Sequence, residues 1–239
     1  MSNNILIIGA SGDIGSAITR VLSDQGKRVL LQYHSNEKSI TQLEKSIPKE
    51  QWLGAVKANL ETSAGIHDFL ENLSYHIDGV VFAGGRALIG LFQDMTEPEM
   101  DQLFHLHVKT PWLVTRHLLP SMIRQRYGRI ILLSSIWGDI GASMEVLYSS
   151  VKGAQNSFVK ALAKETARSG IAVNGVSPGF IDTKMNEAFN NEERASLLEE
   201  IPSGRAGTPE EVAKVVGFLL SEDTNYINGE IIKVNGAWS

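Results

Sequence analysis

Tyr148 and Lys152 stand four residues apart, and Ser135 precedes Tyr148 by thirteen residues. Positions four apart in a helix share one face, so the phenol and the ammonium would be neighbours. A phenol with a pKa near ~10 is a poor acid–base group at neutral pH, but a nearby ammonium favours the phenolate and lowers that pKa. Tyr148 could then give a proton to a carbonyl oxygen as hydride reaches the carbon, while Ser135 hydrogen-bonds the same oxygen.

Tyr-x-x-x-Lys is also typical of an ordinary surface helix, so the surrounding elements decide its meaning. The apolar run 129–133 predicts a strand that ends at Ser134 and Ser135. Similar runs recur along the chain, separated by stretches with helical spacing of apolar residues. Most runs are apolar throughout, as in parallel strands covered on both faces, so we predict an α/β fold with a doubly wound parallel sheet. The other predicted strands are 5–8, 28–32, 52–57, 79–82, 171–176 and 231–234.

A glycine-rich turn, GASGDIG over 9–15, leads from the first predicted strand into a helix. Glycines permit a tight turn close to a pyrophosphate, and the free N–H groups at the helix start attract phosphate charge. The spacing differs from G-x-G-x-x-G, and an ordinary strand–helix turn is the alternative. We expect the Asp13 carboxylate to cap the helix and to point away from the phosphates. The candidate dinucleotide contacts in this turn are Gly9, Ser11, Gly12, Asp13, Ile14 and Gly15.

The end of the second predicted strand bears on the choice between NADPH and NADH. It reads Gln-Tyr-His-Ser-Asn over 32–36, with no acid to hold a ribose 2′-hydroxyl. Ser35 and Asn36, with Lys38 nearby, suit a 2′-phosphate instead. A polar loop with one basic residue is the alternative interpretation, so the segment favours NADPH and leaves NADH open.

Composition limits the other classes of function. The chain has 239 residues, a net charge of −5 and no cysteine. The length suits one domain over 1–239. The lack of cysteine excludes thiolate metal sites, and we expect no metal. The negative net charge argues against nucleic acid or an anionic membrane as the main partner. No signal-peptide pattern or long apolar segment is present, so we expect a cytoplasmic location without membrane insertion. The polar stretch 183–204 is predicted to be a mobile substrate lid.

These motifs together resemble the short-chain dehydrogenase/reductase family, most closely its bacterial 3-oxoacyl-acyl-carrier-protein reductases, over essentially the whole chain. Matching pieces include the glycine turn, GRII at 128–131, YSSVK at 148–152 and NGVSPG at 174–179. The resemblance implies a Rossmann-type fold, a homotetramer or homodimer, and Tyr148 as general acid/base with Ser135 as its partner. Lys152 would also bind the nicotinamide ribose. Further cofactor contacts implied by the resemblance are Asn59, Ala83, Gly84, Pro178, Gly179, Ile181 and Thr183.

Two departures from the family pattern stand out. Val81-Phe82 replaces an Asn-Asn pair whose side chains brace the sheet. His107 aligns with the asparagine that completes the catalytic tetrad and holds a water of the proton relay. A histidine there could hold a water or shuttle a proton, which makes His107 a candidate catalytic residue, or it could be a packed helix residue without a chemical part.

Three functions remain open from the sequence. The first is NADPH-dependent reduction of a ketone, as in the 3-oxoacyl-acyl-carrier-protein reductases. The second is reduction of a ketone on a modified protein side chain, because the runs 134–138 and 145–155 resemble the elongation factor P 5-aminopentanone reductases. The third is a non-catalytic NAD(P)-binding regulator, which the retention of Tyr148 and Lys152 disfavours. The substrate pocket is predicted to involve Arg86 and Trp137, although Trp137 would equally suit a core position.

Overall fold

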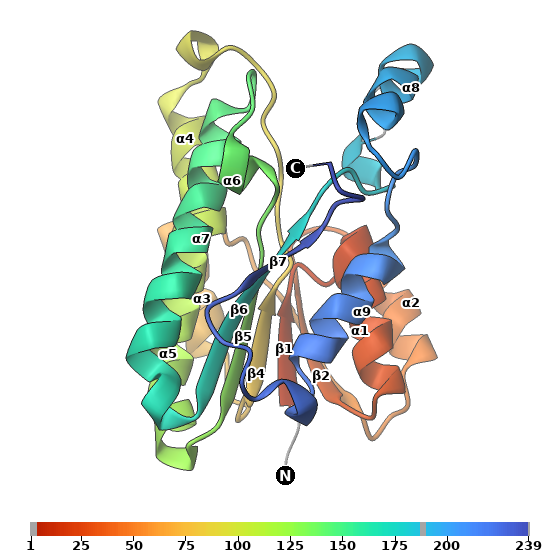
Figure 1. The fold of residues 1–239 in the computed structure, drawn as a ribbon. Coiled ribbons are helices and arrows are strands. Elements are labelled where there is room, and N and C mark those ends of the chain that lie inside the picture. Colours follow the sequence, from red (N-terminus) through yellow and green to blue (C-terminus); the bar gives the residue numbers. More distant parts are fainter. Residues whose placement is uncertain (1–3, 187–189, 239) are drawn as a thin grey trace.

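The computed structural model describes residues 4–186 and 190–238, and these form a three-layer α/β domain (Figure 1). Within the described residues, seven strands form one sheet in the order β3-β2-β1-β4-β5-β6-β7, and each pairing is parallel. This confirms the predicted fold class. The strands are β1 Asn4–Ile8, β2 Arg28–Tyr33, β3 Trp52–Lys57, β4 Gly79–Phe82, β5 Gly128–Leu133, β6 Ile171–Pro178 and β7 Ile231–Val234.

Helices cover both faces of the sheet, which explains why the strands are apolar throughout. Helices α1, α2 and α9 lie on one side, and α3, α5 and α7 lie on the other (Figure 1). Each interface has its own cluster of buried aliphatic side chains. The helices are α1 Asp13–Asp24, α2 Glu37–Ser46, α3 Ser63–Glu71, α4 Glu97–Phe104, α5 Thr110–Gln125, α6 Trp137–Ile140, α7 Val146–Thr166, α8 Asn191–Glu200 and α9 Pro209–Leu219.

The order of the strands creates a crevice at one edge of the sheet. From β1 the chain moves outward to β2 and β3, then crosses back to β4 on the other side of β1. The connections that leave β1 and β4 therefore diverge, and ligands of such sheets bind at this switch point beyond the carboxyl ends of the strands. Ile8 pairs with Phe82 at this edge, so the glycine turn and Ala83 emerge side by side.

A π-helical turn, His105–Lys109, joins α4 to α5. Such turns contain an additional residue per turn and are frequent at functional sites. Thr96 and Glu99 form a capping box at the start of α4. The turn places His107 fully inside the protein, facing α7.

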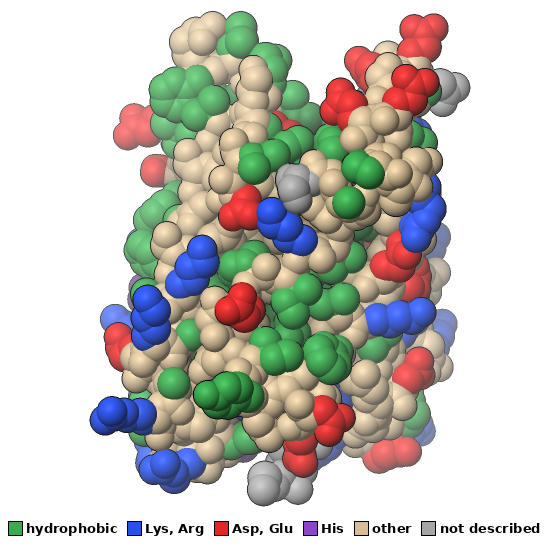
Figure 2. Space-filling model, viewed as in Figure 1, with side chains coloured by type: hydrophobic (Ala, Val, Ile, Leu, Met, Phe, Trp, Pro, Cys, Tyr) green, Lys and Arg blue, Asp and Glu red, His purple; other side chains and the backbone are tan. Residues whose placement is uncertain are grey.

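The stretch that was predicted to be a lid contains the short helical turn Lys184–Asn186 and helix α8; its residues 187–189 lie outside the described residues. Helix α8 stands beyond the carboxyl end of the sheet (Figure 1), and acidic side chains gather over it (Figure 2). Figure 2 also shows the molecule hollowed between α8 and the α4–α6 side. No helix within the described ranges is long and apolar enough to cross a bilayer.

Candidate active site

Two glycines of the turn are required by close backbone contacts. Gly9 has a φ of +78°, and a Cβ there would lie 2.2 Å from the Cα of Gly84. A Cβ on Gly15 would lie 2.2 Å from the Gly9 carbonyl oxygen. Any larger residue would therefore push β1, β4 and α1 apart, which is the physical reason for glycine at these positions.

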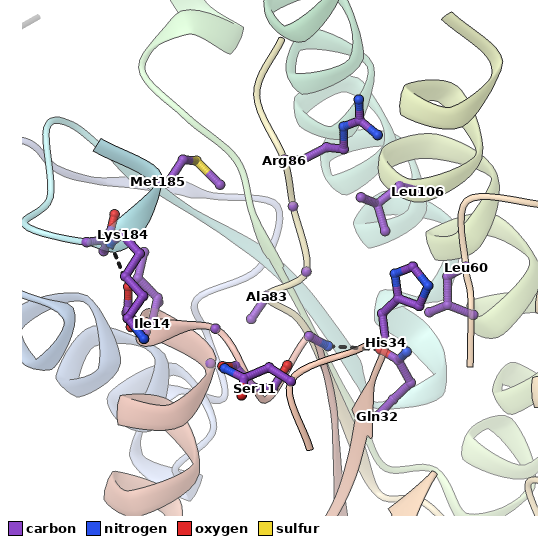
Figure 3. A pocket seen from close by; sticks show the side chains of 18 of the residues that line it. Ser11, Ile14, Gln32, His34, Leu60, Ala83, Arg86, Leu106, Lys184 and Met185 are labelled. Carbon is purple, nitrogen blue, oxygen red and sulfur yellow. Dashed lines mark hydrogen bonds between the residues drawn. The ribbon is translucent and has the colours of Figure 1, made fainter. Parts of the chain in front are cut away.

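The turn forms one wall of a cavity of about 390 Å³ that follows the carboxyl ends of β1, β2, β3 and β4. In Figure 3, Lys184 and Met185 lie on one side of this cavity, and Leu60 and Leu106 lie on the other. The start of α1 opens into it, and the free N–H groups of a helix start favour an anion. The predicted cofactor residues that line it are Gly9, Ser11, Gly12, Asp13, Ile14, Gly15, Asn36, Ala83, Gly84 and Thr183.

The other predicted cofactor residues do not line this cavity; they are Ser35, Asn59, Tyr148, Lys152, Pro178, Gly179 and Ile181. Ser35 lies exposed between two residues that do. Asn59 turns its side-chain oxygen to the backbone N–H of Glu61, at 3.0 Å, while its neighbours reach the cavity. Pro178, Gly179 and Ile181 lie at and beyond the carboxyl end of β6, where the carbonyl of Pro178 accepts from the Ile136 N–H at 3.2 Å.

The expectation for Asp13 is wrong in one respect. Gly12 is the N-cap of α1 and no side chain caps this helix. The Asp13 carboxylate instead accepts a hydrogen bond from the backbone N–H of Lys184 at 2.7 Å (Figure 3). It therefore joins the glycine turn to the beginning of the 183–204 stretch, which sequence spacing alone does not show because the two positions are 171 residues apart.

Gln32 is a site residue that the sequence analysis did not identify. Its side-chain oxygen accepts from the Gly9 N–H at 3.0 Å, and its amide donates to the Ala58 carbonyl at 2.9 Å. Gln32 is 3% exposed, and these two bonds connect the ends of β1 and β3. They lie at the edge of the sheet where the side chains of Val81 and Phe82 cannot hydrogen-bond. The sequence feature that could have identified Gln32 is its single polar amide near the end of an otherwise apolar strand.

Ser135, Tyr148 and Lys152 come together between β5 and α7, as their spacing predicted. The Lys152 Nζ donates to the Leu133 carbonyl at 2.6 Å and lies 5.4 Å from the centroid of the Tyr148 ring. Ser135 lies close enough to the Tyr148 phenol to influence its pKa. The backbone N–H of Trp137 donates to Ser135 Oγ at 3.2 Å and orients that hydroxyl.

Burial controls the proton affinities of this cluster. Burial lowers the pKa of Lys152 to about 7. It also raises the pKa of Tyr148, as does the charge of Glu145, while Ser135 has the opposite effect. The expected lowering of the Tyr148 pKa by Lys152 is therefore wrong for the protein alone, because burial removes the solvent that would stabilise a phenolate. A protonated phenol is the form that can donate to a ketone oxygen.

His107 packs against Tyr148. Its ring meets that of Tyr148 edge to face, with centroids 5.6 Å apart. Its Nε2 lies 3.0 Å from the Arg86 carbonyl oxygen and 3.4 Å from the Arg86 backbone nitrogen, and the shorter contact favours a proton on Nε2. Burial and, secondarily, the charge of Lys152 lower the pKa of His107 well below its ordinary 6.5. The ring is therefore neutral at pH 7, and its buried Nδ1 has no hydrogen-bond partner within the described part of the chain.

Trp137 was predicted to lie either in the substrate pocket or in the core, and the structure places it between these two alternatives. Its ring packs at 5.2 Å between centroids on Trp238, near the end of the chain. Its indole lies near the Glu145 carboxylate and acts to lower the pKa of that group, which is partly buried at the start of α7. Arg86, in contrast, lines the cavity, where its guanidinium donates to Gln102 at 3.1 Å and lies 3.6 Å from a carboxylate oxygen of Glu61.

The chain is similar over nearly its whole length to known proteins. A family profile described as enoyl-(acyl carrier protein) reductase matches residues 9–239. The chain is 43% identical to the uncharacterized oxidoreductase YmfI of Bacillus subtilis, over 100% of this chain and 99% of that protein. It is 36% identical to the 3-oxoacyl-[acyl-carrier-protein] reductase FabG of Rickettsia typhi, over 97% of this chain and 94% of that protein. The crystal structure of a candidate NAD(P)-dependent gluconate 5-dehydrogenase from Beutenbergia cavernae, with NADP bound at low occupancy, matches with a TM-score of 0.92 at 25% identity, covering 99% of this chain and 96% of that one.

Proposed function

This chain belongs to the short-chain dehydrogenase/reductase family of NAD(P)-dependent oxidoreductases, and we propose that it uses NADPH to reduce a ketone to an alcohol. The observation that carries the proposal is the cluster of Ser135, Tyr148 and Lys152 beside the crevice, in which Ser135 and Lys152 are buried and Tyr148 is partly buried. The cavity fits a dinucleotide, because glycine backbone forms its wall and the start of α1 opens into it.

When bound, the cofactor supplies the hydride that adds to the carbonyl carbon. Tyr148 donates the phenolic proton to the ketone oxygen, and the product is the neutral alcohol. Ser135 donates a hydrogen bond to the same oxygen and stabilises its developing negative charge. Lys152 lies behind the phenol and returns a proton to Tyr148, so the site regains its starting protonation once solvent reprotonates Lys152.

The choice of NADPH rests on the end of β2. No acid stands there, and Asn36 borders a second, polar cavity of about 460 Å³. Its cations are Arg20, Lys38 and Lys184; Asp13, Asp182 and Glu210 also line it. Equilibrium binding of NADPH and NADH tests the choice. Lys38→Ala should weaken NADPH about tenfold and leave NADH unchanged, since one charge-assisted contact is lost. Lys45→Ala, at the far end of α2, should change neither.

For the substrate, similarity to FabG supports a 3-oxoacyl thioester. The test is consumption of NADPH with an acetoacetyl thioester by wild type and by Tyr148→Phe. We expect turnover in wild type and a loss of at least about 100-fold in the variant, with NADPH affinity retained, because only the proton donor is removed. Equal turnover in the two proteins would contradict the assignment of Tyr148.

A second substrate, the 5-aminopentanone group on elongation factor P, is supported by Glu145. This carboxylate is partly buried, and its charge acts on Tyr148. Its placement suits a substrate that carries an amine nitrogen as well as a ketone. Turnover of the ketone-bearing protein but not of the acetoacetyl thioester would select this substrate. Binding of NADPH without turnover of either would favour the non-catalytic regulator.

We also propose that the protein works as a homotetramer or homodimer. Phe104 and Trp112 are 41% and 45% exposed and pack edge to face on the outer side of the α4–α5 run. Exposed aromatic pairs of this kind are typical of protein interfaces. Light scattering after gel filtration should give a multiple of the 26.2 kDa chain mass, and Trp112→Glu should lower it.

A further inference from the structure

Gln155 lies on α7 close to Lys152, at a position that the proposed mechanism does not use. The side chain is 4% exposed. Its oxygen accepts from the Lys152 Nζ at 3.3 Å, and its amide nitrogen donates to the carbonyl of His107 at 2.8 Å. The carboxamide therefore forms a bridge from the lysine to the π-helical turn.

This bridge determines how the ammonium is oriented. An ammonium has three N–H donors. One points to the Leu133 carbonyl of β5 and one to Gln155, which leaves the third for Tyr148 or a cofactor. Because a carboxamide has fixed donor and acceptor ends, contact with a backbone carbonyl on one side obliges it to present oxygen on the other. The π-helical turn at His107 thus specifies an acceptor facing Lys152.

Few other charged or titratable groups face Lys152. The π-helical turn contributes the neutral His107, and α7 itself contributes Tyr148. Glu145, the N-cap residue of α7, acts on Tyr148, and Arg86 of the loop after β4 acts on His107. The neighbouring ends of β5 and β6 contribute backbone groups and hydroxyls. Gln155 and the Leu133 carbonyl are the Lys152 Nζ acceptors within the described residues.

We propose that Gln155 is a positioning residue that directs the Lys152 amine at Tyr148 and stabilises its protonated form, because Lys152 is shielded from solvent. The inference rests on the proposed function, in which Lys152 returns a proton to Tyr148. The carboxamide itself transfers no proton, because its oxygen accepts from Lys152 and its nitrogen donates to the His107 carbonyl. It acts through Lys152, and the His107 carbonyl holds it in place.

The test is the titration of Lys152 in the cofactor-free protein. NMR of ¹⁵N-labelled lysine Nζ monitors the titration, and the Lys152→Arg variant assigns the Lys152 signal. Gln155→Glu places a carboxylate beside the ammonium and should raise the Lys152 pKa by about 1–3 units. Gln155→Met keeps the length of the side chain but removes the acceptor, and should lower that pKa by about half a unit to one unit. A residue that only fills space would not produce opposite shifts.

Thr166→Val is the matched control, because Thr166 is a buried polar residue on the same helix that bonds only the Leu162 carbonyl. It should leave the Lys152 titration unchanged. Shifts of Gln155→Glu and Gln155→Met that are absent, or that share one sign, would overturn the proposal. If Gln155→Glu does not fold, the Gln155→Met titration alone decides.

The same variants separate this inference from the proposed function. In ketone reduction, the basic limb of the pH profile of kcat should move to higher pH in Gln155→Glu and to lower pH in Gln155→Met. A wild-type protein that reduces no ketone would refute the proposed function, while the cofactor-free titrations would still report on Gln155.

Discussion

Replacing Lys152 by methionine should change how the stability of the cofactor-free protein depends on pH. Burial lowers the pKa of Lys152 from its ordinary 10.5 to about 7, a difference of about 3.5 pH units. At about 1.36 kcal/mol per unit, the folded state disfavours the ammonium by about 5 kcal/mol. Lys152 is 3% exposed, so solvent screening reduces this figure little.

The sign follows from proton linkage. Between about pH 7 and pH 10.5 the unfolded chain carries the Lys152 proton and the folded protein does not, so the free energy of unfolding rises with pH. Methionine has no proton to bind, so Lys152→Met lacks this rise. Its free energy of unfolding relative to wild type should therefore be about 4 kcal/mol higher at pH 6 than at pH 10.

Other effects of the substitution do not depend on pH. Methionine leaves the Leu133 carbonyl and the Gln155 oxygen without their donor, which costs about 1–3 kcal/mol for each group at any pH. Lys152→Met can thus be less stable than wild type at pH 10 and more stable at pH 6.

The assay is urea unfolding of both proteins at fixed concentration from pH 6 to pH 10. Lys160→Met, at an exposed lysine of the same helix, is the control and should run parallel to wild type. We expect burial to set the pKa of Lys152. This expectation would be refuted if the stability difference between Lys152→Met and wild type varied by less than about 1 kcal/mol over this range.

Two further predictions concern neighbouring groups. The His107 ring should stay neutral from pH 6 to pH 9, with Nε2 protonated, because burial lowers its pKa well below 6.5; ¹⁵N chemical shifts of the imidazole measure this, and protonation above pH 6 would contradict it. Asp13→Ala should speed hydrogen exchange at the Lys184 amide about fivefold, since the loss of one hydrogen bond costs about 1 kcal/mol; an unchanged exchange rate would mean that Asp13 does not hold this amide in solution.

Much of the fold could be predicted because its determinants are local and periodic. All seven predicted strands form, and each predicted range agrees with the observed strand to within about two residues at either end. Short apolar runs bounded by polar or glycine residues have one favourable outcome in an α/β chain, which is a strand buried on both faces. The spacing of Tyr148 and Lys152 on one helix and the position of Ser135 after a strand are equally local.

The tertiary structure decided which distant groups became partners and how strongly the protein buries them. Gln155 meets the His107 carbonyl across 48 residues, and Asp13 meets Lys184 across 171. No spacing rule connects such pairs, because their contact depends on how whole helices pack on the sheet. Burial depends on the same packing. The sequence by itself therefore determined which groups are candidates for the chemistry, while the packing decided that desolvation, rather than the charge of Lys152, sets the pKa of Tyr148.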